Sequence, residues 1–277
     1  MTSKSKVKKW LLGCSVSLAL LLVIGYFAKT SILKQPVTWS FQIKAYEKAD
    51  KEHPPKPGGI VFIGSSSIRY WKTLKADMAP LSVLNRGFGG AMLSHVNHYA
   101  ERILYPYKPK TIVLYAGEND LAWGETGDTV LNELKKFVQI SKKKLPGVFI
   151  YYVSIKPSIS RWGIWQKMAK INTRLKAFVE KQEKMAYIDI SKGMLDEKGQ
   201  PKKDIFVLDN LHMNAKGYQI WTSIIKTRLL QDLKGKSLPK SLKATKVRQS
   251  SVQPRDAGVK SRTQPRGPKK KQVPAKR

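Results

Sequence analysis

The chain has 277 residues, one cysteine and a formal net charge of +33. This length allows one full-sized domain with appendages, and the single cysteine, Cys14, excludes both an internal disulfide framework and a cysteine-rich zinc site. The charge is uneven, because residues 234–277 hold ten Lys, five Arg and a single acidic residue, Asp256.

The chain begins with a basic flank, followed by an apolar run without charged residues, Trp10–Phe27. As a helix this run would reach about 27 Å, close to the roughly 30 Å hydrocarbon core of a bilayer. No A-x-A cleavage site follows it, so we expect an uncleaved anchor within residues 1–29; a cleaved signal peptide with a secreted product, or a buried soluble helix, are the alternatives. The basic flank predicts a cytoplasmic N-terminus and an extracytoplasmic bulk of the chain, periplasmic in a Gram-negative cell.

Residues 30–58 are predicted to connect this anchor to a folded domain at residues 59–233, because Lys51–Gly59 is rich in proline and glycine. In the domain, short apolar runs alternate with longer amphipathic segments. The predicted strands are Ile60–Ile63, Leu81–Leu84, Thr111–Tyr115, Val148–Val153 and Ala186–Ile190. The predicted helices are Thr129–Lys144, Ile164–Lys184 and Asn214–Leu230. This alternation predicts an α/β domain with a parallel sheet covered on both faces.

Residues 234–277 combine proline, serine, glutamine and basic residues with few apolar ones. Such a composition buries too little apolar surface to offset the entropy of ordering, so we predict a disordered tail. Outside the cytoplasm its cationic groups would meet anionic lipid headgroups or cell-envelope polymers rather than nucleic acid. A solvated tail without a dedicated partner is the alternative.

Polar or glycine-rich turns follow several of the predicted strands. Ser66 lies in the turn after the first strand, Gly90 after the second and Asn119 after the third, while Asp209 and His212 precede the last predicted helix. Ligand sites of parallel sheets form at the carboxyl ends of the strands. We therefore expect these turns to converge on one cleft.

Each of these turns can supply one part of an acyl-transfer reaction. A serine on a tight strand-to-helix turn is exposed as a nucleophile, glycine lets a backbone amide approach the substrate, and an asparagine amide can donate to a developing oxyanion. The Asp209-x-x-His212 spacing places a carboxylate beside an imidazole, which can then act as a general base. Singly, these motifs are common in turns and helix caps, and only their combination indicates ester hydrolysis.

The other histidines are less suited to the role of the base. His53 lies in the connecting segment, and His95 and His98 lie three residues apart on a predicted helix after Gly90. That spacing could hold a metal, but no third ligand is evident. A surface or helix-packing role is the favoured interpretation, and no metal site is predicted.

The turns, in this order, resemble the SGNH, or GDSL-type, hydrolase superfamily over roughly residues 58–230. The similar segments are Gly64-Ser65-Ser66-Ser67, Gly90, Gly117-x-Asn119-Asp120 and Asp209-x-x-His212. One position departs from the pattern, because Ser65 stands where the family usually carries an acidic residue.

The resemblance implies a three-layer α/β/α fold of the flavodoxin-like kind, no metal or other cofactor, and Ser66, His212 and Asp209 as a catalytic triad. It also implies an oxyanion hole formed by the amides of Ser66 and Gly90 and by the Asn119 side chain. We therefore expect a serine esterase, of acetyl esterase or lysophospholipase type, acting on a small, glycan or lipid acyl ester. An acyltransferase with the same triad and a non-catalytic envelope-binding protein are the alternatives.

Three further residues are expected on the rim of the cleft, namely Trp123, Arg161 and Trp162. Arg161 could bind an anionic group or a sugar hydroxyl, and either tryptophan could stack on a sugar ring or an acyl chain. Ordinary loop packing is the alternative for all three.

Overall fold

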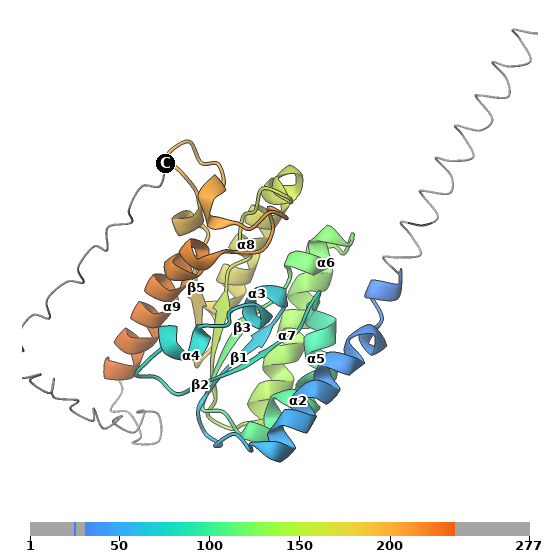
Figure 1. The fold of residues 1–277 in the computed structure, drawn as a ribbon, viewed down its shortest axis with the longest axis vertical. Helices are drawn as coiled ribbons and strands as arrows, with labels where there is room; N and C mark the ends of the chain where they lie inside the picture. Colours follow the sequence, from blue (N-terminus) through green and yellow to red (C-terminus); the bar gives the residue numbers. More distant parts are fainter. Residues whose placement is uncertain (1–24, 26–30, 236–277) are drawn as a thin grey trace, which may run out of the picture. The chain divides into compact units, whose positions relative to one another are not determined.

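The computed structural model describes Gly25 and residues 31–235. At the centre lies a five-stranded parallel sheet in the order β2-β1-β3-β4-β5 (Figure 1). The strands are β1 (Ile60–Gly64), β2 (Val83–Gly87), β3 (Thr111–Tyr115), β4 (Phe149–Val153) and β5 (Met185–Ile188). The predicted α/β fold with a parallel five-stranded sheet is confirmed.

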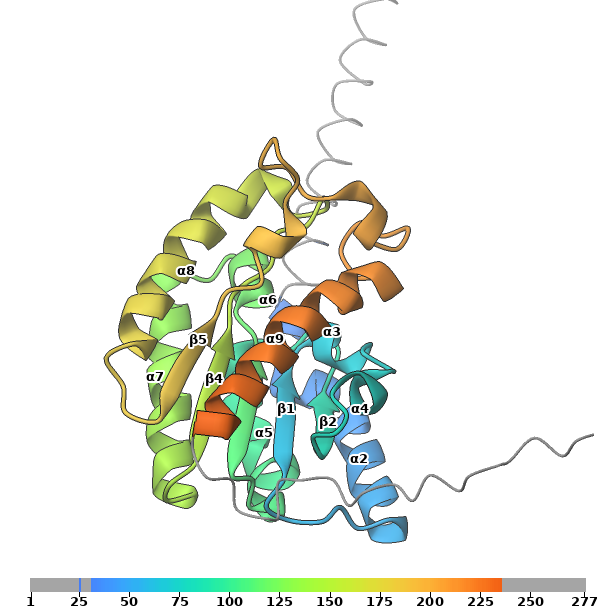
Figure 2. The ribbon, with the colours of Figure 1, turned by 90° about the vertical axis from the view of Figure 1, so that its left-hand side faces the viewer.

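Helices cover both faces of this sheet (Figure 2). One face carries α2 (Ser40–Glu52), α5 (Leu93–Ile103), α7 (Gly127–Lys144) and α8 (Trp165–Val179). The other carries α3 (Ser66–Arg69), α4 (Leu74–Asp77) and α9 (Ala215–Gly235). The connections include α6 (Glu118–Ala122) and the 3-10 turns η1 (Pro36–Trp39), η2 (Tyr105–Tyr107), η3 (Trp162–Ile164), η4 (Lys192–Met194) and η5 (Lys203–Ile205).

Alternation along the strands builds a separate core on each face. Val61 and Ile63 of β1 belong to the core under α5 and α7, whereas Ile60 and Phe62 belong to the core under α9. Successive strand side chains point to opposite faces, so a strand buried on both faces is apolar throughout. This is why uninterrupted apolar runs located the central strands correctly.

The strands end at the same level, which aligns the turns that follow them. Gly64 at the end of β1 pairs with Gly87 of β2 and with Tyr115 of β3. The segments that begin after these three residues therefore leave the sheet side by side, as the positions of α3 and α6 at the same end of the sheet show (Figure 1).

The edge strand β2 differs most from its prediction. It starts at Val83 and continues through Asn85 and Arg86, beyond the predicted end of the strand at Leu84. Their polar side chains are accommodated at the edge, because Asn85 donates to the carbonyl of Ile68 at 2.7 Å and Arg86 pairs with Asp50. An apolar run is therefore a poor guide to the extent of an edge strand.

Helix α2 lies in the segment predicted only to connect the anchor to the domain. It buries Ile43 against the core and packs on α5. The Tyr99 hydroxyl of α5 donates to the carbonyl of Pro36, just before this helix, at 2.7 Å. Most of the helix is polar and exposed, so its sequence carries only a weak apolar periodicity.

The predicted anchor and tail fall mostly outside the described residues. Of the run Trp10–Phe27 only Gly25 is described, and the tail is described no further than Gly235. Within the described part, no helix is long and apolar enough to cross a membrane. The anchor and the disordered tail stay predictions.

Candidate active site

A serine, a histidine and an aspartate from distant parts of the chain form one hydrogen-bonded series at the carboxyl edge of the sheet. Ser66 begins α3 directly after β1, and its Oγ lies 2.8 Å from His212 Nε2. His212 Nδ1 lies 2.5 Å from Asp209 Oδ2, on the loop before α9. With the Nδ1 proton directed at the carboxylate, Nε2 is left to accept the serine proton.

The Asp209 carboxylate also holds its own loop together. Its Oδ1 accepts hydrogen bonds from the backbone amides of Leu211 at 2.9 Å and His212 at 2.8 Å. Burial on its own would raise the pKa of Asp209, but the hydrogen bonds from His212 and Leu211 outweigh it and lower that pKa below the ordinary value. Asp209 is therefore ionised at neutral pH, and its carboxylate fixes the orientation of the His212 ring.

The turn that presents Ser66 requires glycine at position 64. Gly64 has a φ of +143°, and a Cβ there would lie 1.8 Å from the carbonyl oxygen of Tyr115. The Ser65 amide donates to the same carbonyl at 2.9 Å. This close packing against β3 holds Ser66 as the first residue of α3, where its amide is one of the helix donors without an intrahelical partner.

Asn119 lies beside the turn that contains Gly90. Its Nδ2 donates to the carbonyl of Ala91 at 3.0 Å, and its Oδ1 accepts from Arg161 at 2.8 Å. A guanidinium can only donate, so Arg161 keeps the oxygen on its own side and the NH2 group toward Gly90 and Ala91. The role of this amide as an oxyanion donor stays a prediction.

The chain matches the model of the GDSL-like Lipase/Acylhydrolase family over residues 63–220. It belongs to this family. The predicted membership and the ester hydrolase class are thereby confirmed.

Two curated relatives of this GDSL-like hydrolase carry the same name. The platelet-activating factor acetylhydrolase IB subunit alpha2 of Rattus norvegicus is 29% identical over 176 residues, which cover 59% of this chain and 72% of the relative. The protein of that name from Gallus gallus is 26% identical over 193 residues, which cover 65% and 78%.

Solved structures show the same fold. A GDSL-like lipase from Bacteroides thetaiotaomicron superimposes with a TM-score of 0.59 at 18% identity, covering 69% of this chain and 98% of that chain. A lipase/acylhydrolase from Enterococcus faecalis has a TM-score of 0.51 at 18% identity, covering 68% and 98%.

In this GDSL-like hydrolase a buried ion pair supports both the Asn119 turn and the histidine loop. Lys156, fully buried after β4, places Nζ 3.0 Å from Glu118 Oε1 and 2.8 Å from the carbonyl of Leu211. Glu118 also accepts from the Tyr115 hydroxyl at 2.5 Å and pairs with Arg161 at 3.2 Å. The ends of β3 and β4 are thus joined to the loop that carries His212.

The side chains of Glu118 and Lys156 support each other's charged forms, which burial disfavours. Burial on its own would raise the pKa of Glu118, but the nearby cations Lys156 and Arg161 outweigh it and lower that pKa. Burial lowers the pKa of Lys156, and the Glu118 carboxylate opposes that shift. The sequence analysis missed the pair, because nothing in the spacing of two charged residues shows that both become buried together.

The N-terminal segment, residues 31–52, holds the turn Gly87–Gly90 in place. Gln42 Oε1 accepts from the Gly89 amide at 2.9 Å, and the Tyr46 hydroxyl donates to the Gly87 carbonyl at 2.5 Å. Trp39 lies over Gly90, since a Cβ on this residue, whose φ is +65°, would approach the indole to 2.4 Å. The predicted oxyanion glycine is therefore covered by a residue outside the family match.

His95 connects this segment to α5. Its Nδ1 accepts from Trp39 Nε1 at 3.1 Å and from the Met92 amide at 3.2 Å, and its Nε2 donates to the Lys34 carbonyl at 2.9 Å. Burial lowers the pKa of His95 and favours this neutral ring. His95 thus has a packing role. Among the described residues, no cluster of three or more His, Cys, Asp or Glu could hold a metal.

The three predicted rim residues occupy different settings. Trp123 ends α6 and approaches the Cβ position of Gly90 to 3.1 Å. Arg161, with 13% of its side chain exposed, is engaged by Glu118 and Asn119. Trp162 stacks on a neighbouring tryptophan with ring centroids 6.1 Å apart. Direct contact with a substrate stays a prediction for all three.

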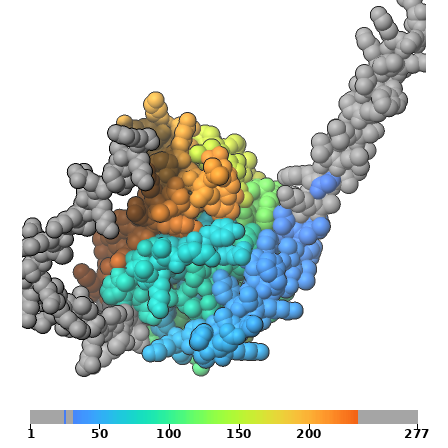
Figure 3. All heavy atoms as spheres, viewed as in Figure 1, coloured from blue at the N-terminus to red at the C-terminus, as the bar shows by residue number. Residues whose placement is uncertain are grey.

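The reacting groups lie at an open surface. The side chains of His212 and Asp209 are 21% and 47% exposed, and Tyr70, which the sequence analysis missed, contacts the His212 ring edge-on at 4.9 Å. In Figure 3 the orange segment that contains the histidine loop lies against the cyan segment that follows β1.

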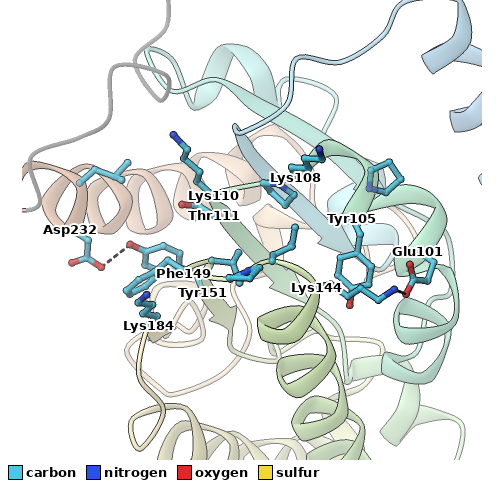
Figure 4. Close-up of a pocket in the computed structure, with 17 residues that line it drawn as sticks. Glu101, Tyr105, Lys108, Lys110, Thr111, Lys144, Phe149, Tyr151, Lys184 and Asp232 are labelled. Carbon is cyan, nitrogen blue, oxygen red and sulfur yellow. Dashed lines mark hydrogen bonds and ion pairs between the residues drawn. The ribbon is translucent and has the colours of Figure 1, made fainter.

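A separate hollow of about 1020 Å³ lies at the opposite end of the strands (Figure 4). It is lined by apolar residues at the amino ends of β3 and β4 and by lysines that include Lys108, Lys144 and Lys184. None of the predicted site residues lines it, so this hollow is no part of the candidate active site.

Proposed function

We propose that this chain hydrolyses short acyl esters through an acyl-enzyme on Ser66. The observation that carries this proposal is the pair of contacts from His212, 2.8 Å to the serine oxygen and 2.5 Å to the Asp209 carboxylate. As Ser66 Oγ attacks the ester carbonyl carbon, its proton passes to His212 Nε2. The imidazolium formed in this step is stabilised by Asp209.

The oxyanion that forms on the substrate carbonyl is received by the amides of Ser66 and Gly90 and by Asn119 Nδ2. The imidazolium then gives its proton to the departing alcohol, and the acyl group stays on Ser66. Water, deprotonated by the same imidazole, attacks this ester, and the acid leaves as the serine is restored.

The acyl group that we propose is acetyl or another short chain. The rat and chicken relatives are named as acetylhydrolases, which supports a small acyl group. The exposure of the triad supports a large alcohol portion of the ester. A large group on the departing oxygen would extend into solvent and would not clash with protein atoms.

We further propose that the hydrolase acts outside the cytoplasm, held at a membrane by Trp10–Phe27. The run is free of charge and follows a flank with four lysines, Lys4, Lys6, Lys8 and Lys9. Basic residues flank the cytoplasmic ends of membrane helices, so this order directs the domain to the other side.

The proposed chemistry is tested by exposing the full chain to a fluorophosphonate and measuring intact mass and the modified peptide. We expect one adduct, on Ser66, and no adduct in Ser66→Ala or His212→Ala. Ser67→Ala serves as the matched control, since it removes the next hydroxyl of the same serine run and should still be labelled. Adduct formation and ester turnover that persist in Ser66→Ala would rule out this mechanism.

A further inference from the structure

The large exposed apolar side chains of the described residues fall into two groups. Among the described residues, the large apolar side chains with high exposure are Ile32 (61%), Val37 (70%), Phe41 (63%), Tyr70 (41%), Val207 (44%) and Leu208 (101%). Three of them lie next to the histidine loop, and the other three lie on the N-terminal segment, residues 31–52. A concentrated apolar patch on an otherwise polar surface marks an interaction site.

One group of these side chains adjoins the histidine loop. The ring of Tyr70 contacts that of His212. The Val207 amide donates to the His212 carbonyl at 2.9 Å, which places Leu208, fully exposed, next to Asp209. These three apolar residues therefore flank the reacting groups on one side.

The second group flanks the opposite side, on the N-terminal segment. Val37 and Phe41 lie two residues before and after Trp39, the residue that covers Gly90. Lys34 of the same segment pairs with Glu125, beyond α6, at 2.7 Å. In Figure 1 the start of this blue segment lies near the end of the sheet where α3 and α6 begin, and α2 runs from there along the sheet.

The sequence before this segment indicates that a lipid bilayer can lie against this edge of the sheet. The apolar run ends at Phe27, and the described fold starts at Ser31 on the same edge as the triad. The peptide units between these residues span at most about 14 Å. When the apolar run Trp10–Phe27 lies in a bilayer, this short connection keeps the start of the N-terminal segment close to the lipid.

We propose that the carboxyl edge of the sheet is a membrane-docking face, whose apolar residues around the triad enter the interface of a phospholipid bilayer. Ser66 then takes amphiphilic esters directly from the lipid surface. This inference rests on the ester hydrolysis and membrane attachment proposed above. Half-buried Trp39, Trp123 and Trp162 at the same edge are of the residue type that membrane interfaces favour.

Docking is tested by attaching single fluorescent labels to the full chain and measuring how deeply each label enters the bilayer. Cys14→Ser removes the native thiol, and Phe41→Cys, Leu208→Cys or Lys143→Cys then adds one. The labelled proteins are placed in vesicles of phosphatidylcholine and phosphatidylglycerol that contain nitroxide-labelled phosphatidylcholine. We expect strong quenching at positions 41 and 208. Lys143, exposed near the end of α7 at the far end of the strands, is the control and should stay unquenched.

Unquenched labels at positions 41 and 208, or equal quenching at all three positions, would overturn the docking face. A full chain that fails to float with the vesicles would overturn it too, since attachment is required. None of these readouts depends on turnover. A failure of the esterase proposal is seen separately, as the absence of a fluorophosphonate adduct on Ser66.

A second experiment compares two double variants on two substrates. Val37→Ser with Phe41→Ser removes apolar groups from the face, and Lys143→Ser with Glu183→Ser changes the far end without altering net charge. With a water-soluble acetyl ester, both should match the parent. With a long-chain ester carried in vesicles, only the first should lose turnover, by several-fold. Equal turnover of the vesicle substrate by both variants would count against docking, as would a loss by the first variant on both substrates.

Discussion

The side-chain amide of Asn119 is held in one orientation by a neighbour that can only donate. Arg161 bonds to the oxygen, so the nitrogen faces Gly90 and Ala91. Arg161 is itself fixed by the buried carboxylate of Glu118. An oxyanion donor is effective when it needs no reorientation during the reaction, and these contacts provide that constraint.

We therefore expect Asn119→Ala to lower kcat for a para-nitrophenyl acetate substrate by about 10²–10³. The loss should fall mainly on kcat, because the donor acts on charge that develops in the transition state. Asn97→Ala is the matched control, since Asn97 bonds to Glu133 on the helical face away from the site. A kcat for Asn119→Ala equal to that of the control would exclude an oxyanion role.

Asp120, the residue after this donor, is buried and makes stability depend on pH. Its carboxyl accepts from the Leu93 amide at 3.0 Å, and burial raises its pKa to about 7. The folded state thus keeps a proton that the unfolded state has lost between about pH 4 and pH 7, and the free energy of unfolding falls as pH rises through this window. Each pH unit costs up to about 1.4 kcal/mol.

Asp120→Asn, which resembles the protonated acid and can still accept from Leu93, should remove this dependence. We expect the unfolding free energy of the variant, measured in urea, to rise relative to that of the parent from about pH 4 to about pH 7. A constant difference across this range would show that Asp120 is ionised when buried.

At the scale of elements, the N-terminal segment fixes a turn that lies far from it in sequence. Trp39 covers Gly90, and Gln42 and Tyr46 bond to the backbone of the same turn. A displacement of about 1 Å at a reacting centre can cost roughly 10²-fold in rate. We therefore expect the segment to affect catalysis through the position of this turn, without touching the reacting atoms.

We expect Trp39→Ala to lower kcat for a soluble acetyl ester by about tenfold or more with little change in KM. Trp39→Phe keeps a ring over Gly90 but loses the bond to His95, and should recover part of the rate. Phe41→Ala, two residues further along the same segment but exposed, is the control and should leave kcat unchanged. If Trp39→Ala retained full activity, the Gly90 turn would not depend on this segment.

The ion pair of Lys156 and Glu118 joins the ends of two strands to the histidine loop. We expect Lys156→Met to reduce the unfolding free energy by about 3–5 kcal/mol, because it leaves a buried carboxylate with one partner fewer. Glu118→Gln added to that variant should recover part of the loss, as urea denaturation would show. Without any recovery in the double variant, the loss could not be attributed to unpaired charge.

How far the sequence predicts this site depends on how local each interaction is. Asp209 and His212 are three residues apart, and Ser66 directly follows an apolar strand, so local patterns identified them. Trp39 and Lys156 meet their partners only through the tertiary fold. The packing of α2 was missed for the same reason, because its contacts lie with residues that are distant in sequence.

At the scale of the whole molecule, α9 marks the end of the hydrolase fold. Leu229 and Leu233 of this helix are buried, and its last two residues, Lys234 and Gly235, already belong to the predicted basic tail, residues 234–277. We expect a chain without residues 236–277 to keep its turnover of a soluble ester. Its binding to anionic vesicles should weaken, and this difference from the full chain should shrink as salt is added. Unchanged vesicle binding would show that the tail has no part in it.

The stretch shared with the family, residues 63–220, is shorter than the unit that the contacts hold together. A protein trimmed to it would lack both Trp39 and Leu233. A chain released by proteolytic shedding just before Ser31 would instead keep every contact of the N-terminal segment with the Gly87–Gly90 turn. With the anchor proposed above, the same polypeptide would exist as a tethered and as a diffusible enzyme, with one reaction centre and two different sets of reachable esters.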